Sequence, residues 1–257
     1  MQDFFMNCAT VLQKYGFSYL RGAGTTLLLA LVGTFFGCLI GFAVGALQTI
    51  PIDKQRDPVW KRVLLKILHI FLRCYVELFR GTPMIVQAVF IYYGLLQVFG
   101  IKMGMWQAGF FIVSINTGAY MAEIVRGGII SIDRGQFEGA MSIGMTHAQT
   151  MFKVIIPQVM RNILPSVSNE FVINIKDTSV LNVIGVTELY YFAGIIKRQN
   201  FQTFQTYLVI CILYFILTFT ITRLLRWVER KLDGNENYTI FGSQTDVNAE
   251  IHITKEG

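Results

Sequence analysis

The stretch GAGTTLLLALVGTFFGCLIGFAVGALQTIPI, residues 22–52, decides the fold class, because its 31 residues include no Asp, Glu, Lys or Arg. A helix needs about 20 mostly apolar residues to cross a bilayer core roughly 30 Å thick. Three further charge-free runs, at 81–101, 103–122 and 199–222, are also long enough. The sequence therefore predicts an all-α integral membrane protein.

The composition supports the same class. The 257 residues are 53% hydrophobic and only 15% charged, whereas soluble domains contain about 25% charged residues. A chain so poor in charge is not expected to be disordered either. The net charge of +6 indicates basic cytoplasmic loops. We therefore expect contact with membrane lipid and no binding of nucleic acid.

A fifth apolar region covers about 154–187 and is interrupted by charges. It is too apolar for an ordinary loop, so we expect about five transmembrane helices, one of them charge-bearing. The charges in this region are Arg161, Glu170, Lys176 and Asp177.

The distribution of Lys and Arg predicts the orientation. The connection after the first span and the end of the last span are rich in Lys and Arg. The only basic residues in 1–21 are Lys14 and Arg21. We expect the N-terminus outside and the C-terminus in the cytoplasm. The predicted organisation is an extracytoplasmic segment (1–20), a transmembrane domain (21–232) and a polar cytoplasmic tail (233–257).

The cysteines and histidines show no metal-ligand spacing, so no metal is expected.

Two sets of polar residues share helix faces near the second and third spans. Arg73, Glu77 and Arg80 can pair with one another on one helix, which should end in a kink before Pro83. The second set, on the third span, should face a partner helix or a water-filled path. It consists of Asn116, Tyr120 and Glu123.

Small residues recur at every fourth position of the first span, at Gly33, Gly37, Gly41 and Gly45. Such a stripe allows another helix to approach closely, without indicating which one.

The fourth span contains Glu170, Lys176 and Asp177 within eight residues. Each unpaired charge would cost about 2.5–3.5 kcal/mol at mid-membrane. Charges of both signs on a partly broken helix suit a zwitterion such as a free amino acid. The alternative is an ion-pair network that only holds helices together.

The segment EGAMSIGMTHAQTMFKVIIPQ, residues 138–158, resembles the EAA loop of ATP-binding cassette (ABC) importers. Three residues separate Glu138-Gly139-Ala140 from Gly144, and nine more separate Gly144 from Val154-Ile155-Ile156-Pro157. Three further motifs resemble permease subunits for polar amino acids, of the histidine, arginine and glutamine type. They are YVELFRGTPMIVQAVFIYYGL (75–95), NTGAYMAEIVRGGI (116–129) and NEFVINIKDTSVLNVIG (169–185).

The resemblance covers about residues 20–232. It implies the type I ABC importer permease fold, in the bacterial cytoplasmic (inner) membrane, with a cytoplasmic coupling loop at about 131–157. The implied partners are a second permease subunit, identical or related, a cytoplasmic ATPase dimer and an external amino-acid-binding protein.

The resemblance also implies roles for individual residues. Those implied to dock the ATPase are Glu138, Gly139, Ala140 and Gly144. Those implied to bind substrate are Asn116, Glu170, Lys176, Asp177, Thr178 and Ser179.

The chain contains no G-x-x-x-x-G-K-[ST] phosphate-binding loop. We therefore expect a transport subunit rather than an enzyme, with no cofactor of its own and with ATP and Mg on the partner ATPase. The alternative is a self-sufficient secondary amino-acid transporter or channel.

Overall fold

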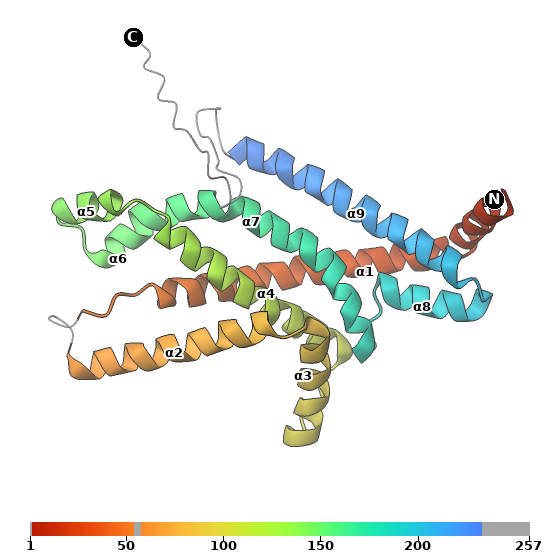
Figure 1. Cartoon of the computed structure of the whole chain (residues 1–257), viewed down its shortest axis with the longest axis horizontal. Coiled ribbons are helices and arrows are strands. Elements are labelled where there is room, and N and C mark those ends of the chain that lie inside the picture. Colours follow the sequence, from red (N-terminus) through yellow and green to blue (C-terminus); the bar gives the residue numbers. More distant parts are fainter. Residues whose placement is uncertain (1, 54–57, 233–257) are drawn as a thin grey trace, which may run out of the picture.

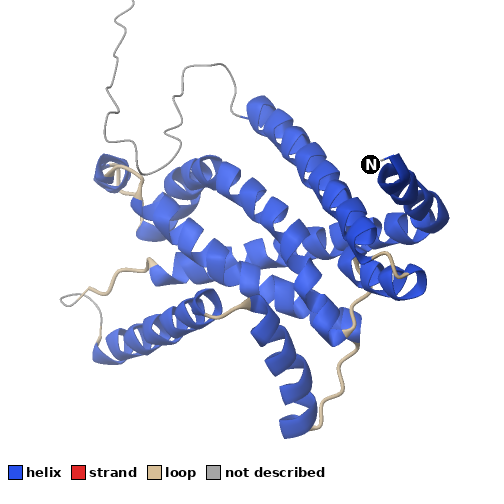
Figure 2. Ribbon diagram, turned by 45° about the vertical axis from the view of Figure 1, so that its right-hand side comes forward, coloured by secondary structure: helices blue, strands red, loops and turns tan. Residues whose placement is uncertain are grey.

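The computed structural model describes residues 2–53 and 58–232, and all regular secondary structure in these ranges is helical (Figure 2). The predicted tail at 233–257 lies outside the described residues. In chain order the segments are α1 (Gln2–Gln48), α2 (Val59–Gly81), α3 (Met84–Phe99), α4 (Met105–Ile130), α5 (Arg134–Ser142), α6 (His147–Thr150), the π-helical η1 (Met151–Ile155), α7 (Ile156–Asp177), the 3₁₀ segment η2 (Thr178–Ile184), α8 (Leu189–Asn200) and α9 (Thr203–Leu232).

In the described chain, three helices, α1, α4 and α9, are each long and apolar enough to cross a membrane. Two bent pairs, α2 with α3 and α6–η2 with α8, raise the number of spans to five if each pair is one span. Figure 1 shows α1 running through the molecule, with α2 on one side and α7 and α9 on the other. The prediction of an all-helical membrane protein with about five spans is confirmed.

Helix α1 packs against α4 through its glycine stripe. A Cβ atom on Gly41 would lie 2.2 Å from Cβ of Met121 and 2.8 Å from the backbone nitrogen of Ala122. At Gly33 a Cβ would lie 2.2 Å from the Val113 side chain. The glycines therefore allow the two helices to touch at backbone distance, and α4 is the partner that the sequence left open.

Helix α1 begins much earlier than the predicted start of the first span at residue 22. Its 47 residues correspond to about 70 Å, more than twice the hydrocarbon thickness. The early turns are helical because they have a packing partner. Val11 and Tyr19 are buried in a cluster with Leu189 and Ala193 of α8.

The predicted kink before Pro83 is confirmed as a bend of 114° between α2 and α3. Pro83 lacks the N–H that would bond to the carbonyl of Phe79 in a continuous helix. The Gln87 amide donates to that carbonyl at 2.9 Å, and the Asn116 amide of α4 donates to it at 3.4 Å. Asn116 also donates to Gln87 Oε1 at 2.9 Å. The bend is therefore closed by side chains of α3 and α4.

The charge-bearing span is irregular at both ends, as its composition predicts. Pro157 cannot donate to the carbonyl four residues earlier, and the chain before it is π-helical, with Ile156 N–H donating to Met151 O. Beyond Asp177 the helix tightens into η2, which ends at Gly185 with φ 86°. Only glycine adopts that conformation readily.

Candidate functional site

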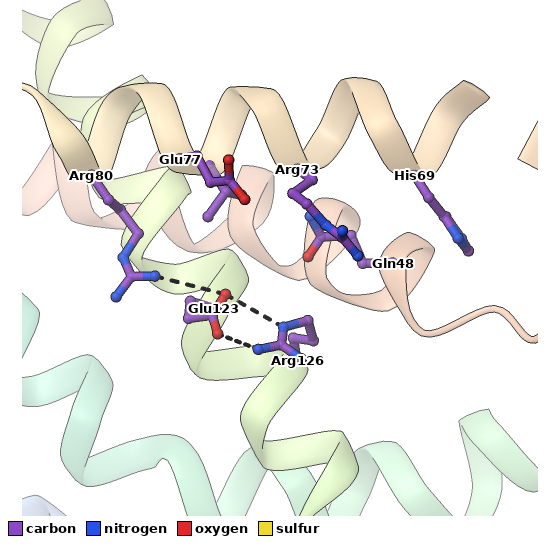
Figure 3. Close-up of a pocket in the computed structure, with 8 residues that line it drawn as sticks. Gln48, His69, Arg73, Glu77, Arg80, Glu123 and Arg126 are labelled. Atoms are coloured by element: carbon purple, nitrogen blue, oxygen red, sulfur yellow. Dashed lines mark hydrogen bonds and ion pairs between the residues drawn. The ribbon is translucent and has the colours of Figure 1, made fainter. Parts of the chain in front are cut away.

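A cavity of about 470 Å³ lies where α2 and α4 approach the end of α1 (Figure 3). We call it the charged cavity, because five of its eight lining residues are Arg or Glu. It is lined by Gln48, His69, Arg73, Val76, Glu77, Arg80, Glu123 and Arg126. Its volume lies within the range of small-molecule sites, about 300–1,000 Å³.

Glu123 is the centre of an ion-pair network at one end of this cavity. Its carboxylate pairs with Arg126 one turn further along α4, and Arg80 Nη1 of α2 lies 3.8 Å from its second oxygen. The Arg80 guanidinium also lies 5.6 Å from the centre of the Tyr120 ring. All three ionised side chains remain 33–42% exposed. The network is therefore accessible, and Figure 3 shows it facing the space between the helices.

The predicted substrate residues of α7 and η2 divide into exposed and buried groups. Lys176 and Asp177 are exposed, and Glu170 is half-buried. Glu170 interacts electrostatically with Asp177 and with Arg80 of α2. Arg80 forms its ion pair with Glu123 and attracts the Glu170 carboxylate of α7 electrostatically.

The remaining predicted positions are more enclosed. Thr178 is fully buried and donates to the carbonyl of Ile175 at 3.2 Å, and Ser179 is half-buried. Asn116 is 8% exposed and is bonded to Gln87 and Phe79 at the α2–α3 bend. The structure thus gives Asn116 a role in closing the bend, and its contact with substrate stays a prediction.

Uncharged polar residues meet in a separate cluster between α1, α4 and α7. The Asn174 amide donates to the hydroxyl of Thr34 at 2.8 Å and to the hydroxyl of Thr117 at 2.9 Å. All three side chains are buried. We call this the neutral cluster. Its groups bond to one another, so it serves to hold three helices together.

The charged residues near the end of α7 indicate that one face of the chain needs a neighbouring surface. Exposed ionised groups on a membrane helix are costly against lipid and face a bundle interior or a water-filled path. The face that carries Lys176 and Asp177 therefore requires a second protein surface or water beside it.

The predicted coupling loop folds into α5, α6 and η1. Asp133 begins α5 by accepting a hydrogen bond from Gly135 N–H at 2.7 Å. Gly144 ends it with φ 82°, and Met145 N–H donates to Ala140 O at 3.2 Å. This hydrogen bond and the left-handed glycine form a Schellman cap. The glycine of the EAA pattern is therefore required by backbone geometry.

The exposed face of α5 contains only part of the predicted docking set. Glu138, Gly139 and Gly144 are exposed, whereas Ala140 is 7% exposed and packs inward. Met141 and Ile143 are 50% and 78% exposed. Sequence reasoning missed these two apolar side chains, although Met141, three residues after Glu138, could have been placed on the same helix face.

Sequence reasoning also paired the charges of α2 only with one another. In the structure Arg80 pairs with Glu123 of α4. The sequence offered one signal for this pair: both helices carry three polar residues at the same spacing, and the two sets end in Arg80 and Glu123. Within the described chain, no three His, Cys, Asp or Glu residues lie close enough together to hold a metal ion.

Two bent helix pairs, an accessible charged cavity between α1, α2 and α4, and a short capped helix in the loop after α4 fit a membrane permease subunit. Residues 60–234 match the family described as binding-protein-dependent transport system inner membrane component. The chain belongs to this family, whose members are transport subunits of ABC importers rather than enzymes.

Two relatives and a solved structure show how far the similarity extends. The chain is 34% identical to the probable amino-acid ABC transporter permease protein PatM of Vibrio harveyi, over 83% of this chain and 91% of that protein. It is 33% identical to the glutamine transport system permease protein GlnP of Escherichia coli K12, over 83% and 92%. A crystal structure of an amino acid ABC transporter with histidines matches at a TM-score of 0.75 and 37% identity, covering 86% of this chain and 96% of that one.

Proposed function

We propose that this chain is the permease subunit through which an ABC importer moves polar amino acids. The observation that carries the proposal is the charged cavity, where Arg80, Glu123 and Arg126 are ionised yet partly exposed. An amino acid carries an ammonium and a carboxylate, so its passage needs fixed groups of both signs. The names of the relatives, which refer to amino acids and glutamine, support the same substrate class.

The substrate path in this proposal runs from the predicted residues of α7 to the charged cavity. Glu170, Lys176 and Asp177 supply both signs of charge, and Arg80, the ion-pair partner of Glu123, also attracts Glu170 electrostatically. Thr178 and Ser179 begin the irregular η2 beside these charges. Asn116 shapes the path by fixing the α2–α3 bend.

The partners follow from surfaces that the single chain leaves exposed. A second permease subunit, identical or related, would cover the face with Lys176 and Asp177 and complete the path. The outer face of α5, with Glu138, Gly139 and Gly144 beside Met141 and Ile143, would dock into a cytoplasmic ATPase dimer that binds ATP and Mg. An amino-acid-binding protein would deliver substrate from outside.

The proposed orientation places the N-terminus outside and the C-terminus in the cytoplasm of the bacterial inner membrane. The basic end of α9 and the Lys and Arg residues at the start of α2, Lys61, Arg62 and Lys66, support it. In this orientation the charged cavity lies at the cytoplasmic side, since it is lined by Gln48 at the end of α1 and Arg126 near the end of α4.

The test is reconstitution of the chain with candidate ATPase and binding-protein subunits in lipid nanodiscs and in liposomes. We expect co-purification with the ATPase and ATP hydrolysis that rises when the binding protein presents a few polar amino acids. Liposomes should accumulate the same amino acids only when they contain ATP. Uptake by this chain without an ATPase would overturn the importer proposal. Stimulation only by solutes other than amino acids would overturn the substrate class.

A further inference from the structure

The last turns of α9 carry a stripe of basic and aromatic side chains on one face. Relative to its first member, the others lie three, four, seven and eight residues later, which places all of them on the same side of a helix. All of them are exposed. The members of this basic stripe are Arg223, Arg226, Trp227, Arg230 and Lys231.

Contacts within α9 arrange these side chains as one surface. The Arg223 guanidinium lies 5.0 Å from the centre of the Phe219 ring, and the Lys231 ammonium lies 4.6 Å from the centre of the Trp227 ring. Arg230 Nε donates to the carbonyl of Arg226 at 3.2 Å. A guanidinium has five N–H donors, so donors remain for an external oxygen. Glu229 falls about 120° from the centre of the stripe by helical spacing.

The surroundings of α9 indicate what this surface meets. Only 11% of the most apolar stretch of α9 is buried within the chain, compared with 67% for α4. Figure 1 shows α9 along an edge of the molecule. The turns before the stripe expose apolar side chains that suit lipid chains. These are Ile212, Phe215, Ile216 and Phe219, each about half exposed or more.

The length of α9 places the stripe at the depth of lipid headgroups. Its 30 residues extend about 45 Å, which equals the thickness of a bilayer including its headgroup regions. The apolar turns thus fill the hydrocarbon layer and the stripe follows directly. Tryptophan is favoured at this depth, and clustered Lys and Arg attract anionic lipid phosphates.

We propose that the basic stripe of α9 binds the phosphate of an anionic phospholipid in the cytoplasmic leaflet. Arg226 and Arg230 would contact the phosphate oxygens, and Trp227 would lie against the glycerol region. The site requires that α9 spans the membrane, and its assignment to the cytoplasmic leaflet rests on the orientation proposed above. It is therefore independent of the transported solute, and a binding assay tests it separately from transport.

The test uses the fluorescence of Trp227 in the full-length chain. Trp60→Phe and Trp106→Phe leave Trp227 as the single tryptophan. Nanodiscs of phosphatidylcholine would contain either brominated phosphatidylglycerol or brominated phosphatidylcholine at equal mole fraction. We expect the anionic lipid to quench Trp227 at least about twofold more at low salt. High salt should weaken this preference, since it screens exposed charges.

Variants distinguish the stripe from general basicity. Replacing its four cations with Gln should abolish the lipid preference, whereas Arg→Lys at 223, 226 and 230 should retain it. A control with Lys102→Gln, Lys197→Gln and Arg198→Gln removes three charges elsewhere and should change nothing. Unchanged quenching by brominated phosphatidylcholine verifies that α9 of each variant is still inserted. Equal quenching by both lipids, or a preference that survives in the Gln variant, would overturn the proposal.

Discussion

Helices α1 and α4 take part in two polar regions that differ in charge and in exposure. The neutral cluster of Thr34, Thr117 and Asn174 is buried, and its members bond to one another. The charged cavity around Glu123 is partly open, and its Arg side chains come from both α2 and α4. Polar side chains that hydrogen-bond to one another inside the protein hold helices together. Ionised groups that remain exposed need water, a substrate or a second subunit.

This contrast explains why residues that are close in sequence have different roles. Asn116 and Thr117 face the packed interior of the chain, whereas Tyr120 and Glu123 lie beside Arg80. On α7, Asn174 joins the packing while Glu170 interacts with Arg80. We therefore expect substitutions in the packed region to act on stability and substitutions in the charged cavity to act on transport.

The largest effect should come from breaking the packing of α1 on α4. Gly41→Leu would force a side chain into a site where even a Cβ meets Met121 at 2.2 Å and backbone at 2.8 Å. Overpacking costs about 1–3 kcal/mol and occasionally more, so we expect almost no folded complex after purification. Size-exclusion chromatography in detergent measures this. Gly24→Leu on the same helix, where a Cβ meets nothing within 4 Å, should purify normally, and equal loss in both variants would contradict the assignment.

The next effect should come from the charged cavity. Arg80→Gln removes the cation that pairs with Glu123 and attracts Glu170 electrostatically. We expect ATP-dependent uptake to fall at least tenfold, about 1.4 kcal/mol in the barrier, while the melting temperature stays nearly unchanged because Arg80 is 42% exposed. Arg80→Lys retains the charge and should recover part of the uptake. Full uptake by the Gln variant would exclude Arg80 from the path.

A smaller effect should follow at the exposed face of α5. Glu138→Ala removes an exposed carboxylate without disturbing the inward packing of Ala140. We expect association with the ATPase to weaken about three- to tenfold, since an interface charge is worth about 1 kcal/mol at a partly exposed position. A titration of detergent-purified permease with the ATPase measures the Kd. Glu229→Ala on α9 is the matched carboxylate control, and equal Kd values for the two variants would place the docking surface elsewhere.

The smallest effect should come from the neutral cluster. Asn174→Val removes the hydrogen bonds to Thr34 and Thr117, and interhelical hydrogen bonds contribute about 0.6–1.7 kcal/mol each in membranes. We expect the free energy of unfolding to fall by about 1–2 kcal/mol, with uptake per folded complex within about twofold of the starting protein. Reversible denaturation in mixed micelles measures the first quantity. A large loss of uptake at unchanged stability would move Asn174 to the substrate path.

Local chemistry allowed much of the fold to be predicted from the sequence. The charge-free runs predicted the spans, and Pro83 predicted the bend, because a missing N–H acts at a fixed position. The early start of α1 could not be predicted, since it depends on Val11 and Tyr19 packing against α8. The size of the bend could not be predicted either, because it depends on hydrogen bonds to Phe79 from Gln87 of α3 and Asn116 of α4.

The candidate site was predicted only in part. The charges of α2 and α4 were recognised on each helix separately, yet the Arg80–Glu123 pair depends on how these helices cross. The EAA pattern predicted a short helix ending at Gly144. The inward position of Ala140 depends on how α5 packs on the rest of the chain.

The most direct test of the account is thiol accessibility at two hydroxyl positions of the membrane layer. Ser179→Cys would probe the predicted path and Thr117→Cys the neutral cluster, each in the assembled transporter with Cys8, Cys38, Cys74 and Cys211 replaced by Ser. A charged, water-soluble methanethiosulfonate reagent should label position 179, more slowly when transported amino acid is present. It should leave position 117 unlabelled. Equal labelling of both positions, or labelling of position 117 alone, would contradict the division between a charged path and a neutral packing cluster.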